Sequence, residues 1–320
     1  MAVKDIWEEM GKPIDQGGVG LADTEDLYVE KKTQIVLSTD GERLDIDEII
    51  TNFCVLLGFS GCGKSNGVAV ILEKLLDHFV PLLLVDLMGE HTGILNAYRS
   101  QFMEVDASKH PMDEDIKELA RSFITSRKSC YLDLSKVHRS EYMHFLDVFL
   151  WACIDLKFEV PDEQRIPHMF VFEEAHNFIP REMRSTDVKN PHAIRVVEAI
   201  LKMALEARKF GIRPLLISLR PVLLDTNTIA QAGVMFLMKV QHARDKQFYQ
   251  DTVSGVKRAD LWKRLQEMQV GNYIFFRSKK IAYHKRFLRR HTSDLSKTPN
   301  MASLNGFQMG AGTVLKSGNI

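Results

Sequence analysis

A glycine-rich segment between an apolar run and a helical stretch places the strongest constraint on the fold. It reads Gly58-Phe59-Ser60-Gly61-Cys62-Gly63-Lys64-Ser65 and fits the pattern G-x-x-x-x-G-K-[ST]. The apolar run 53–57 precedes it, and a predicted helix over 65–78 follows it. In this context the glycines let backbone N–H groups surround a phosphate, and the helix N-terminus favours the negative charge. The segment therefore predicts an α/β fold with a site for nucleotide phosphates.

The motif also assigns chemistry to individual residues. Lys64 is expected to reach the β- and γ-phosphates, and the hydroxyl of Ser65 is expected to bind Mg²⁺. The nucleotide is expected to be held by the whole loop and the residue after it: Gly58, Ser60, Gly61, Cys62, Gly63, Lys64, Ser65 and Asn66. The predicted ligands are ATP and Mg²⁺.

Short apolar runs alternate with stretches of helical periodicity along most of the chain. Strands that are apolar on both faces are typical of a parallel sheet covered by helices. Strands are expected at 53–57, 81–85, 129–134, 169–172 and 215–218, with 234–240 and 273–276 extending the sheet. Helices are expected at 68–78 and 196–209. Alternating βαβ units predict a P-loop NTPase of the RecA-like kind: a doubly wound, mainly parallel sheet with helices on both faces.

The rest of the chain is predicted to decorate this domain. Residues 1–34 are expected to form an N-terminal extension that contains the start of a short hairpin. The pattern Tyr28-Val29, Gln34–Leu37 and Asp40-Gly41 within residues 27–44 indicates this hairpin. Residues 35–285 form the ATPase domain. Residues 286–320 begin basic, finish rich in Gly, Ser and Asn, and are expected to form a tail or strap.

Composition excludes several classes of protein. Basic and acidic residues number 42 each, so a DNA partner would have to meet a local basic lining, such as a channel between subunits. The four cysteines are scattered, which argues against a disulfide framework or a zinc site and favours the reducing cytoplasm. No apolar run approaches the ~20 residues that cross a bilayer, so no membrane association is expected.

Two carboxylates follow a second apolar strand. Glu173 and Glu174 come directly after the run 169–172. Ligands of open α/β sheets gather at this carboxyl edge. Glu173 is expected to orient Mg²⁺ through its water, and Glu174 is expected to polarise the attacking water. The alternative is the acidic first turn of a helix, which the helix dipole favours.

The segment Glu173-Glu174-Ala175-His176-Asn177-Phe178 resembles the Walker B segment of the HerA–FtsK superfamily, and most of all that of HerA-type DNA-translocating ATPases. Three further stretches agree with this family in order and spacing: 61–66, 85–91, and 208–211 followed by 215–221. The resemblance covers residues 35 to 280. It implies an ATP hydrolase that acts as a ring, expected to be hexameric.

Three features depart from the family pattern. Glu173 stands where the family usually has aspartate, which changes the magnesium geometry by one methylene. Leu219 stands where the family usually has glutamine, and a leucine cannot hydrogen-bond to a γ-phosphate. The family's N-terminal barrel domain has no counterpart beyond the predicted hairpin.

Two arginines carry roles that the resemblance implies. Arg208 would act on the γ-phosphate bound by a neighbouring subunit, and Arg220 would sense the nucleotide within its own subunit. The alternatives are a surface salt bridge for Arg208 and a structural hydrogen-bond fork for Arg220.

Other polar residues are open to two interpretations. Asp86 and Glu90 either organise the site or stabilise a turn. The loop residues Arg181, Arg184 and Lys189 either contact DNA phosphates or form a solvated loop of mixed charge. The histidines His91 and His176 are expected to be hydrogen-bonding partners rather than metal ligands. The tail arginines Arg286, Arg289 and Arg290 share the ambiguity of the loop residues.

Three functions are compatible with these features. The first is a homo-oligomeric ring motor that moves double-stranded DNA beside a nuclease or effector partner. The second is a compact packaging or conjugation-type ATPase, or the ATPase of a defence complex. The third is a nucleotide-gated scaffold with little turnover, which Glu173 and Leu219 favour. Stimulation of ATP turnover by duplex DNA would separate the first two from the third.

Overall fold

Nine strands form one central sheet in the computed structural model, which describes residues 33–110, 112–240, 258–277 and 280–293, together with Asp245, Phe248 and Tyr249. The strand order is β11-β10-β9-β3-β8-β7-β4-β6-β5. The strands are β3 (Cys54–Leu57), β4 (Leu82–Asp86), β5 (Phe102–Asp106), β6 (Ser129–Asp133), β7 (His168–Phe172), β8 (Ile212–Ser218), β9 (Val234–Met238), β10 (Asn272–Arg277) and β11 (Lys280–Arg286). All neighbours pair in parallel except β9–β10 and β10–β11. The predicted fold class, a mainly parallel α/β sheet, is confirmed.

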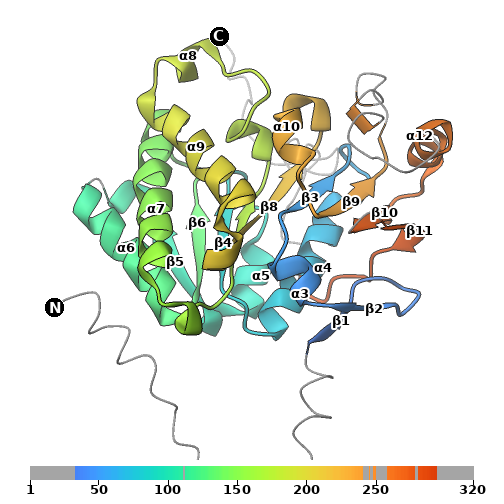
Figure 1. The fold of residues 1–320 in the computed structure, drawn as a ribbon, viewed down its shortest axis with the longest axis horizontal. Helices are drawn as coiled ribbons and strands as arrows, with labels where there is room; N and C mark the ends of the chain where they lie inside the picture. The colour runs from blue at the N-terminus through green and yellow to red at the C-terminus, as the bar shows by residue number, and fades with distance from the viewer. Residues whose placement is uncertain are drawn as a thin grey trace, which may run out of the picture.

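Helices cover both faces of this sheet, as Figure 1 shows. One face carries α6 (Asp113–Ser126), α7 (Arg139–Glu159), α9 (Pro191–Leu205) and α12 (Arg258–Glu267), and the other carries α3 (Asp47–Ile50), α4 (Lys64–Asp77) and α5 (Thr92–Ala97). Short helices complete the connections: α8 (Ser185–Val188), α10 (Thr226–Ile229), η1 (Arg99–Gln101), η2 (Ala107–Lys109), η3 (Asp162–Gln164), η4 (Ala175–Asn177), η5 (Ala207–Phe210) and η6 (Pro221–Leu223). Successive residues of β3 alternate between two buried cores: Val55 and Leu57 pack on one side, Cys54 and Leu56 on the other.

Two strands escaped prediction because they lack a continuous apolar run. β5 lies at one edge of the sheet and carries Glu104, and β11 lies at the other edge with the sequence KIAYHKR. Edge strands have one side open to solvent, so they tolerate charge that a central strand would bury at a cost. The seven predicted strands are all present, with ends shifted by at most three residues.

Local signals explain where α9 begins and ends. Asn190 precedes the helix, and its side chain accepts a hydrogen bond from His192 N at 3.0 Å, while Pro191 takes the first helical position. The helix ends at Leu205, so the predicted helix 196–209 is too long, and Arg208 lies instead in the 3₁₀ turn η5. Gly211 ends that turn in the left-handed region (φ +70°), where a Cβ would meet Ile166 O at 2.7 Å.

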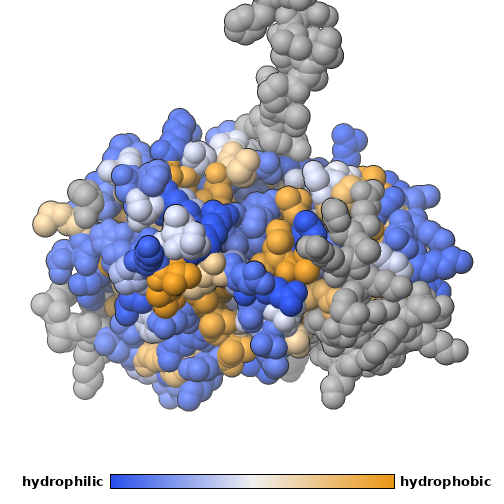
Figure 2. Space-filling model, turned by 90° about the horizontal axis from the view of Figure 1, so that it is seen from above, coloured by the Kyte–Doolittle hydropathy of each residue, from blue (hydrophilic) through white to orange (hydrophobic). Residues whose placement is uncertain are grey.

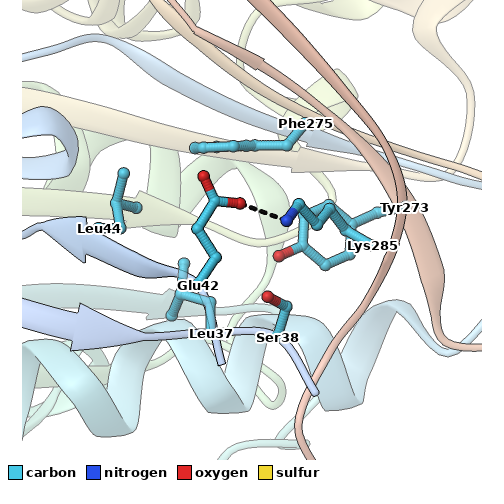
Figure 3. Close-up of a pocket in the computed structure, with 7 residues that line it drawn as sticks. All are labelled: Leu37, Ser38, Glu42, Leu44, Tyr273, Phe275 and Lys285. Atoms are coloured by element: carbon cyan, nitrogen blue, oxygen red, sulfur yellow. Dashed lines mark ion pairs between the residues drawn. The ribbon is translucent and has the colours of Figure 1, made fainter. Parts of the chain in front are cut away.

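A hairpin packs against the sheet beside β10 and β11. β1 (Gln34–Val36) and β2 (Arg43–Asp45) pair antiparallel, and Lys285 of β11 forms ion pairs with Asp40 and Glu42 of the connecting turn. Figure 3 shows this amine beneath Phe275, with Leu37, Leu44 and Tyr273 around it. The hydrogen bond from Lys285 lowers the pKa of Asp40 to about 2. The predicted hairpin is thus confirmed in 34–45, while Tyr28-Val29 lies outside the described residues.

The predicted domain boundaries stay predictions, because 1–32 and 294–320 lie outside the described residues. Residues 288–293, which belong to the predicted tail, pack along α4. Among the helices that the structure describes, none is both long and apolar enough to span a bilayer.

A buried lysine makes the stability of the fold depend on pH. Lys157 of α7 is 1% exposed, and its Nζ donates to Ile166 O at 2.5 Å. Burial lowers the pKa of this amine to about 7, against ~10.4 in an unfolded chain. Between these values the unfolded chain binds more protons than the folded one, so the free energy of unfolding rises as the pH rises.

We expect Lys157→Met to remove this pH dependence. Between pH 7 and pH 9, wild-type stability should gain up to about 1.4 kcal/mol per pH unit relative to the variant, because the unfolded amine keeps a proton that it must release on folding. Urea unfolding at several pH values measures it. Lys74→Met, at a more exposed amine beside Asp77, is the control and should follow the wild-type slope. A Lys157→Met curve parallel to the wild type would show that the amine binds its proton equally in the folded and unfolded chain, so that burial does not lower its pKa.

Candidate nucleotide and magnesium site

The loop after β3 is wedged between neighbouring segments at the carboxyl edge of the sheet. A Cβ on Gly58 would lie 2.7 Å from Met238 Cβ and from Cys62 Sγ. Gly63 has φ +90°, and a Cβ there would lie 2.9 Å from Gly271 N. Gly271 N also donates to Cys62 O at 2.8 Å. The glycines are therefore required by close packing and by backbone conformation, and the loop is held open toward solvent at Gly61.

Helix α4 begins at Lys64 directly after this loop. Its N-cap, Gly63, offers no side chain to the N–H groups of the first turn. Those donors are left for a ligand, and the dipole of a 14-residue helix favours an anion there. Ser65 is exposed in the first turn, and Lys64 is 8% exposed. This arrangement is compatible with a phosphate site, and the roles of its individual residues stay predictions.

Lys64 and Glu174 meet across the site. Lys64 Nζ lies 3.5 Å from Glu174 Oε1. The other oxygen, Glu174 Oε2, is buried without a hydrogen bond and lies 3.3 Å from His176 Nδ1, which also has none. Burial lowers the pKa of His176, with help from the charges of Arg184 and Lys64, so the ring is neutral and this contact is not an ion pair. A buried oxygen without a partner marks a place for a ligand or water.

Glu174 sits in a strained turn between β7 and η4. Its φ of +46° lies in the left-handed region, which is uncommon for a residue with a side chain. Burial raises the pKa of its carboxyl, although the charge of Lys64 opposes this. A carboxylate with a raised pKa is a better proton acceptor, which suits the predicted role of Glu174.

Asp86 shapes the turn beside these carboxylates. It ends β4, is 1% exposed and accepts a hydrogen bond from Tyr131 Oη at 3.0 Å. Three backbone N–H groups also bind its carboxylate, those of Met88, Gly89 and His91 at 2.8–3.0 Å. Asp86 therefore stabilises the turn, which was one of its two predicted roles. The turn directs His91 toward the site.

His91 holds the second carboxylate. Its Nε2 lies 3.0 Å from Glu173 Oε1, and both side chains are buried. Burial disfavours charge on either group, but their mutual hydrogen bond and attraction raise the pKa of His91 and lower the pKa of Glu173. His91 is thus a hydrogen-bonding partner, as expected. Sequence reasoning missed its partner because the two residues are 82 positions apart.

The charges around the site suit a divalent cation. Four carboxyl groups, of Asp86, Glu90, Glu173 and Glu174, surround the cations Lys64 and His91. Burial and the charge of Glu173 raise the pKa of Glu90, which shows an excess of negative charge. The described residues hold no cluster of three or more metal ligands. The carboxylates and the exposed hydroxyl of Ser65 are oxygen ligands of the kind that Mg²⁺ takes together with phosphates and water.

The two predicted arginines lie at opposite ends of strand β8: Arg220 follows its C-terminal end and Arg208 precedes its N-terminal end. Arg220 follows β8 and lines a cleft of about 760 Å³ together with His176, and its Nε is buried without a hydrogen bond. Arg208 is exposed before the N-terminal end of β8. β8 is seven residues long and its last four residues pair in parallel with β3, so roughly 20 Å separate Arg208 from the carboxyl edge. The structure brings Arg220 to the site and keeps Arg208 away from the phosphates of its own chain.

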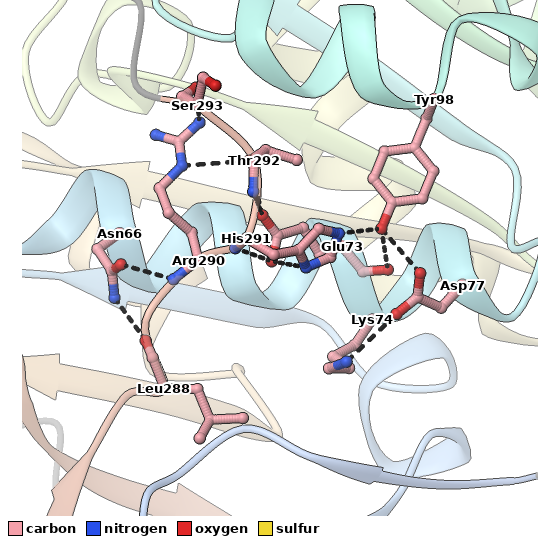
Figure 4. A network of polar contacts seen from close by, with 10 residues as sticks. All are labelled: Asn66, Glu73, Lys74, Asp77, Tyr98, Leu288, Arg290, His291, Thr292 and Ser293. Carbon is pink, nitrogen blue, oxygen red and sulfur yellow. Dashed lines mark hydrogen bonds and ion pairs between the residues drawn. The ribbon is translucent and has the colours of Figure 1, made fainter.

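A strap, residues 288–293, fastens α4 from outside. Asn66 donates to Leu288 O at 2.8 Å and accepts from Arg290 N at 3.0 Å, and Glu73 accepts from the backbone N–H groups of His291 and Thr292 (Figure 4). The side chain of Asn66, expected to contact the nucleotide, is thus hydrogen-bonded to the strap instead. The one signal in the sequence for this contact was Glu73, a charged residue on the otherwise apolar face of α4 that is buried in the structure.

The carboxyl edge forms one face of the molecule. In Figure 1 it lies at the top, where α8 and α10 follow β7 and β8. Figure 2 looks down on this face and shows polar side chains with separate groups of apolar side chains between them. A mixed surface of this kind is compatible with contacts to a polar or charged partner.

Known proteins resemble this chain in sequence. The family described as the central domain of helicase HerA matches residues 38–306. A probable helicase of Methanocaldococcus jannaschii is 29% identical over 323 residues, which cover 72% of this chain and 61% of the relative. The DNA double-strand break repair helicase HerA of Saccharolobus solfataricus is 28% identical over 131 residues, which cover 41% of this chain and 24% of the relative. The chain spans less than two thirds of these curated relatives.

Solved structures share the fold. VirB4 of Thermoanaerobacter pseudethanolicus superposes with a TM-score of 0.54 at 12% identity, covering 84% of this chain and 98% of that one. The genome packaging NTPase B204 of Sulfolobus turreted icosahedral virus 2, in complex with AMPPCP, gives 0.51 at 14% identity, covering 74% and 98%. These likenesses show a P-loop NTPase fold. Because the family match spans most of its length, the chain belongs to the HerA helicase central-domain family.

Proposed function

We propose that this chain is an ATP hydrolase that works as a ring on double-stranded DNA. The observation that carries the proposal is the meeting of Lys64 and Glu174, 3.5 Å apart, at the end of the phosphate-binding loop. The names of the curated relatives, a probable helicase and a DNA-repair helicase, support DNA as the substrate. A nuclease or effector protein is the expected partner of the ring.

The residues divide the reaction between them. The first turn of α4 and Lys64 bind the phosphates, and Ser65 and Glu173 would hold Mg²⁺. That ion, when bound, neutralises phosphate charge. Once phosphate engages Lys64, the carboxylate of Glu174 loses its cation and is left to accept a proton from water. His91 keeps Glu173 ionised and oriented throughout.

Arg208 is proposed to complete the site of a neighbouring subunit. It is exposed, and η5 is fixed because Phe210 stacks on Phe158 at 3.9 Å and carries Arg165 over its ring at 4.7 Å. A rigid, exposed arginine on the far edge of one subunit can face the nucleotide edge of the next in a closed ring. Arg220 is proposed to act within its own subunit.

We expect Glu174→Gln to lower ATP turnover by about 100-fold or more and to leave ATP binding within about twofold, because the amide cannot accept a proton from water. Phosphate release, with and without duplex DNA, measures turnover. Glu118→Gln on the exposed surface of α6 is the control. Unchanged turnover would show that Glu174 is not the proton acceptor. A wild-type rate that DNA does not raise would favour the nucleotide-gated scaffold.

We expect Arg208→Ala and Glu174→Gln, each inactive alone, to restore turnover when mixed. In a mixed ring, a subunit with intact Glu174 can receive intact Arg208 from its neighbour. The arginine is expected to contribute about 10³-fold to turnover, and native mass measurement with ATP, Mg²⁺ and DNA gives the subunit number. Lys209→Ala, at the adjacent residue, is the control. Failure of the mixture to regain activity, in rings shown to be mixed, would exclude action across subunits.

A further inference from the structure

A cleft rich in arginine is lined by His176, whose ring contacts Glu174. Arg181, Arg184 and Arg220 line it together with His176, and the cleft measures about 760 Å³. Glu182 is the one acidic side chain among its lining residues. Arg181 and Arg184 are exposed on the loop between η4 and α8. Three guanidinium groups around one hollow form a site for phosphate groups, because each can donate several hydrogen bonds to phosphate oxygens.

One of these arginines is bonded to the residue that supports Glu174. Arg184 Nη2 donates to Asn177 Oδ1 at 2.8 Å. The amide nitrogen of the same side chain donates to Glu174 O at 3.1 Å, and Asn177 N donates to that carbonyl at 2.9 Å. Asn177 therefore closes the left-handed turn of Glu174, and Arg184 sets the orientation of its amide.

The backbone beneath this relay is anchored separately. Arg139 of α7 donates to Asn177 O at 2.8 Å and binds both carboxylate oxygens of Asp187, at 3.1 and 2.8 Å. The side chain of Arg139 is half-buried and that of Asp187 is buried. The loop is thus fixed at its two ends, while the contact between Arg184 and Asn177 is exposed to the cleft. A ligand can change this contact without unfolding the loop.

We propose that Asn177 is a positioning residue that couples phosphate binding in the arginine cleft to the orientation of Glu174. This inference rests on the proposed function, and it names the phosphodiester backbone of duplex DNA as the ligand of the cleft. Without DNA, the relay holds Glu174 in its strained turn beside Lys64. A DNA phosphate draws Arg184 away from a neutral amide, since a charged acceptor binds guanidinium more strongly. The amide of Asn177 then loses its orientation, and Glu174 is released toward the phosphates of ATP.

The first test uses the full chain without DNA. Asn177→Ala and Arg184→Gln both break the relay, and each should raise kcat by about threefold while the KM for ATP is unchanged, because the restrained population is shifted to the released one. Loss of a merely structural contact would lower kcat or stability instead. Wild-type kcat in Asn177→Ala, or a fall in kcat, would overturn the proposed restraint. Thermal unfolding checks that both variants are folded.

The second test adds duplex DNA, with binding measured by fluorescence anisotropy of a labelled duplex. Asn177→Ala should bind DNA as the wild type does, yet its turnover should no longer respond to DNA. Arg181→Gln is the matched control: it removes one charge from the same cleft but no bond to Asn177. It should need roughly threefold more DNA for half-maximal stimulation and keep the full maximal stimulation.

The outcomes separate this inference from the proposed function. If Arg181→Gln loses stimulation as Arg184→Gln does, the effect is one of charge alone and the relay is wrong. If the wild type does not respond to DNA while Asn177→Ala still turns over faster, the DNA motor and the ligand of the cleft are refuted, and the restraint on Glu174 is supported. If DNA stimulates the wild type and Asn177→Ala alike, the motor is supported and the relay is overturned.

Discussion

The buried pair of His91 and Glu173 constrains most of the site. A carboxylate that is almost fully buried destabilises a fold by several kcal/mol unless a partner compensates it. Here the partner is a histidine whose backbone is fixed by Asp86, which in turn binds three N–H groups and Tyr131. Three neighbouring strands, β7, β4 and β6, therefore end in one connected set of polar contacts. The set keeps Glu173 charged and leaves the next residue, Glu174, to face Lys64.

The parts of this structure that follow from the sequence are local ones. Short contiguous segments determine the phosphate loop, the apolar strands and the position of the two glutamates. Each of these features depends on a few neighbouring residues, because strand burial and loop geometry are local properties. The edge strands β5 and β11 break this rule, since one side of each is free to carry charge. Helix α9 was predicted four residues too long because the turn η5 continues its apolar spacing before Gly211 ends it.

The contacts that tune the site join distant parts of the chain. Asn66 and Leu288 are 222 residues apart, and His91 and Glu173 are 82 apart. Such pairs leave no spacing signal in one sequence. A buried polar residue, such as Glu73 on the apolar helix α4, indicates that a partner exists but does not identify it. For this reason residues 286–320 were predicted as a tail or strap without a named partner, and the packing of residues 288–293 along α4 is a result of the structure.

The proposed roles of Lys64 and Glu174 require their contact to break during a catalytic cycle. In these roles Lys64 binds the phosphates and Glu174 the attacking water, so each would lose the other when ATP binds. The strained turn of Glu174 is compatible with such a change, because a residue held at φ +46° has a lower-energy conformation available once its restraints weaken. Two restraints act on it: Lys64 on the carboxylate and Asn177 on the carbonyl. In the proposed function, ATP competes with Glu174 for Lys64, and a phosphate bound in the arginine cleft weakens the contact of Asn177. Hydrolysis would then require both the nucleotide and a phosphate-bearing partner, as expected for an ATPase that turns over only when it is bound to DNA.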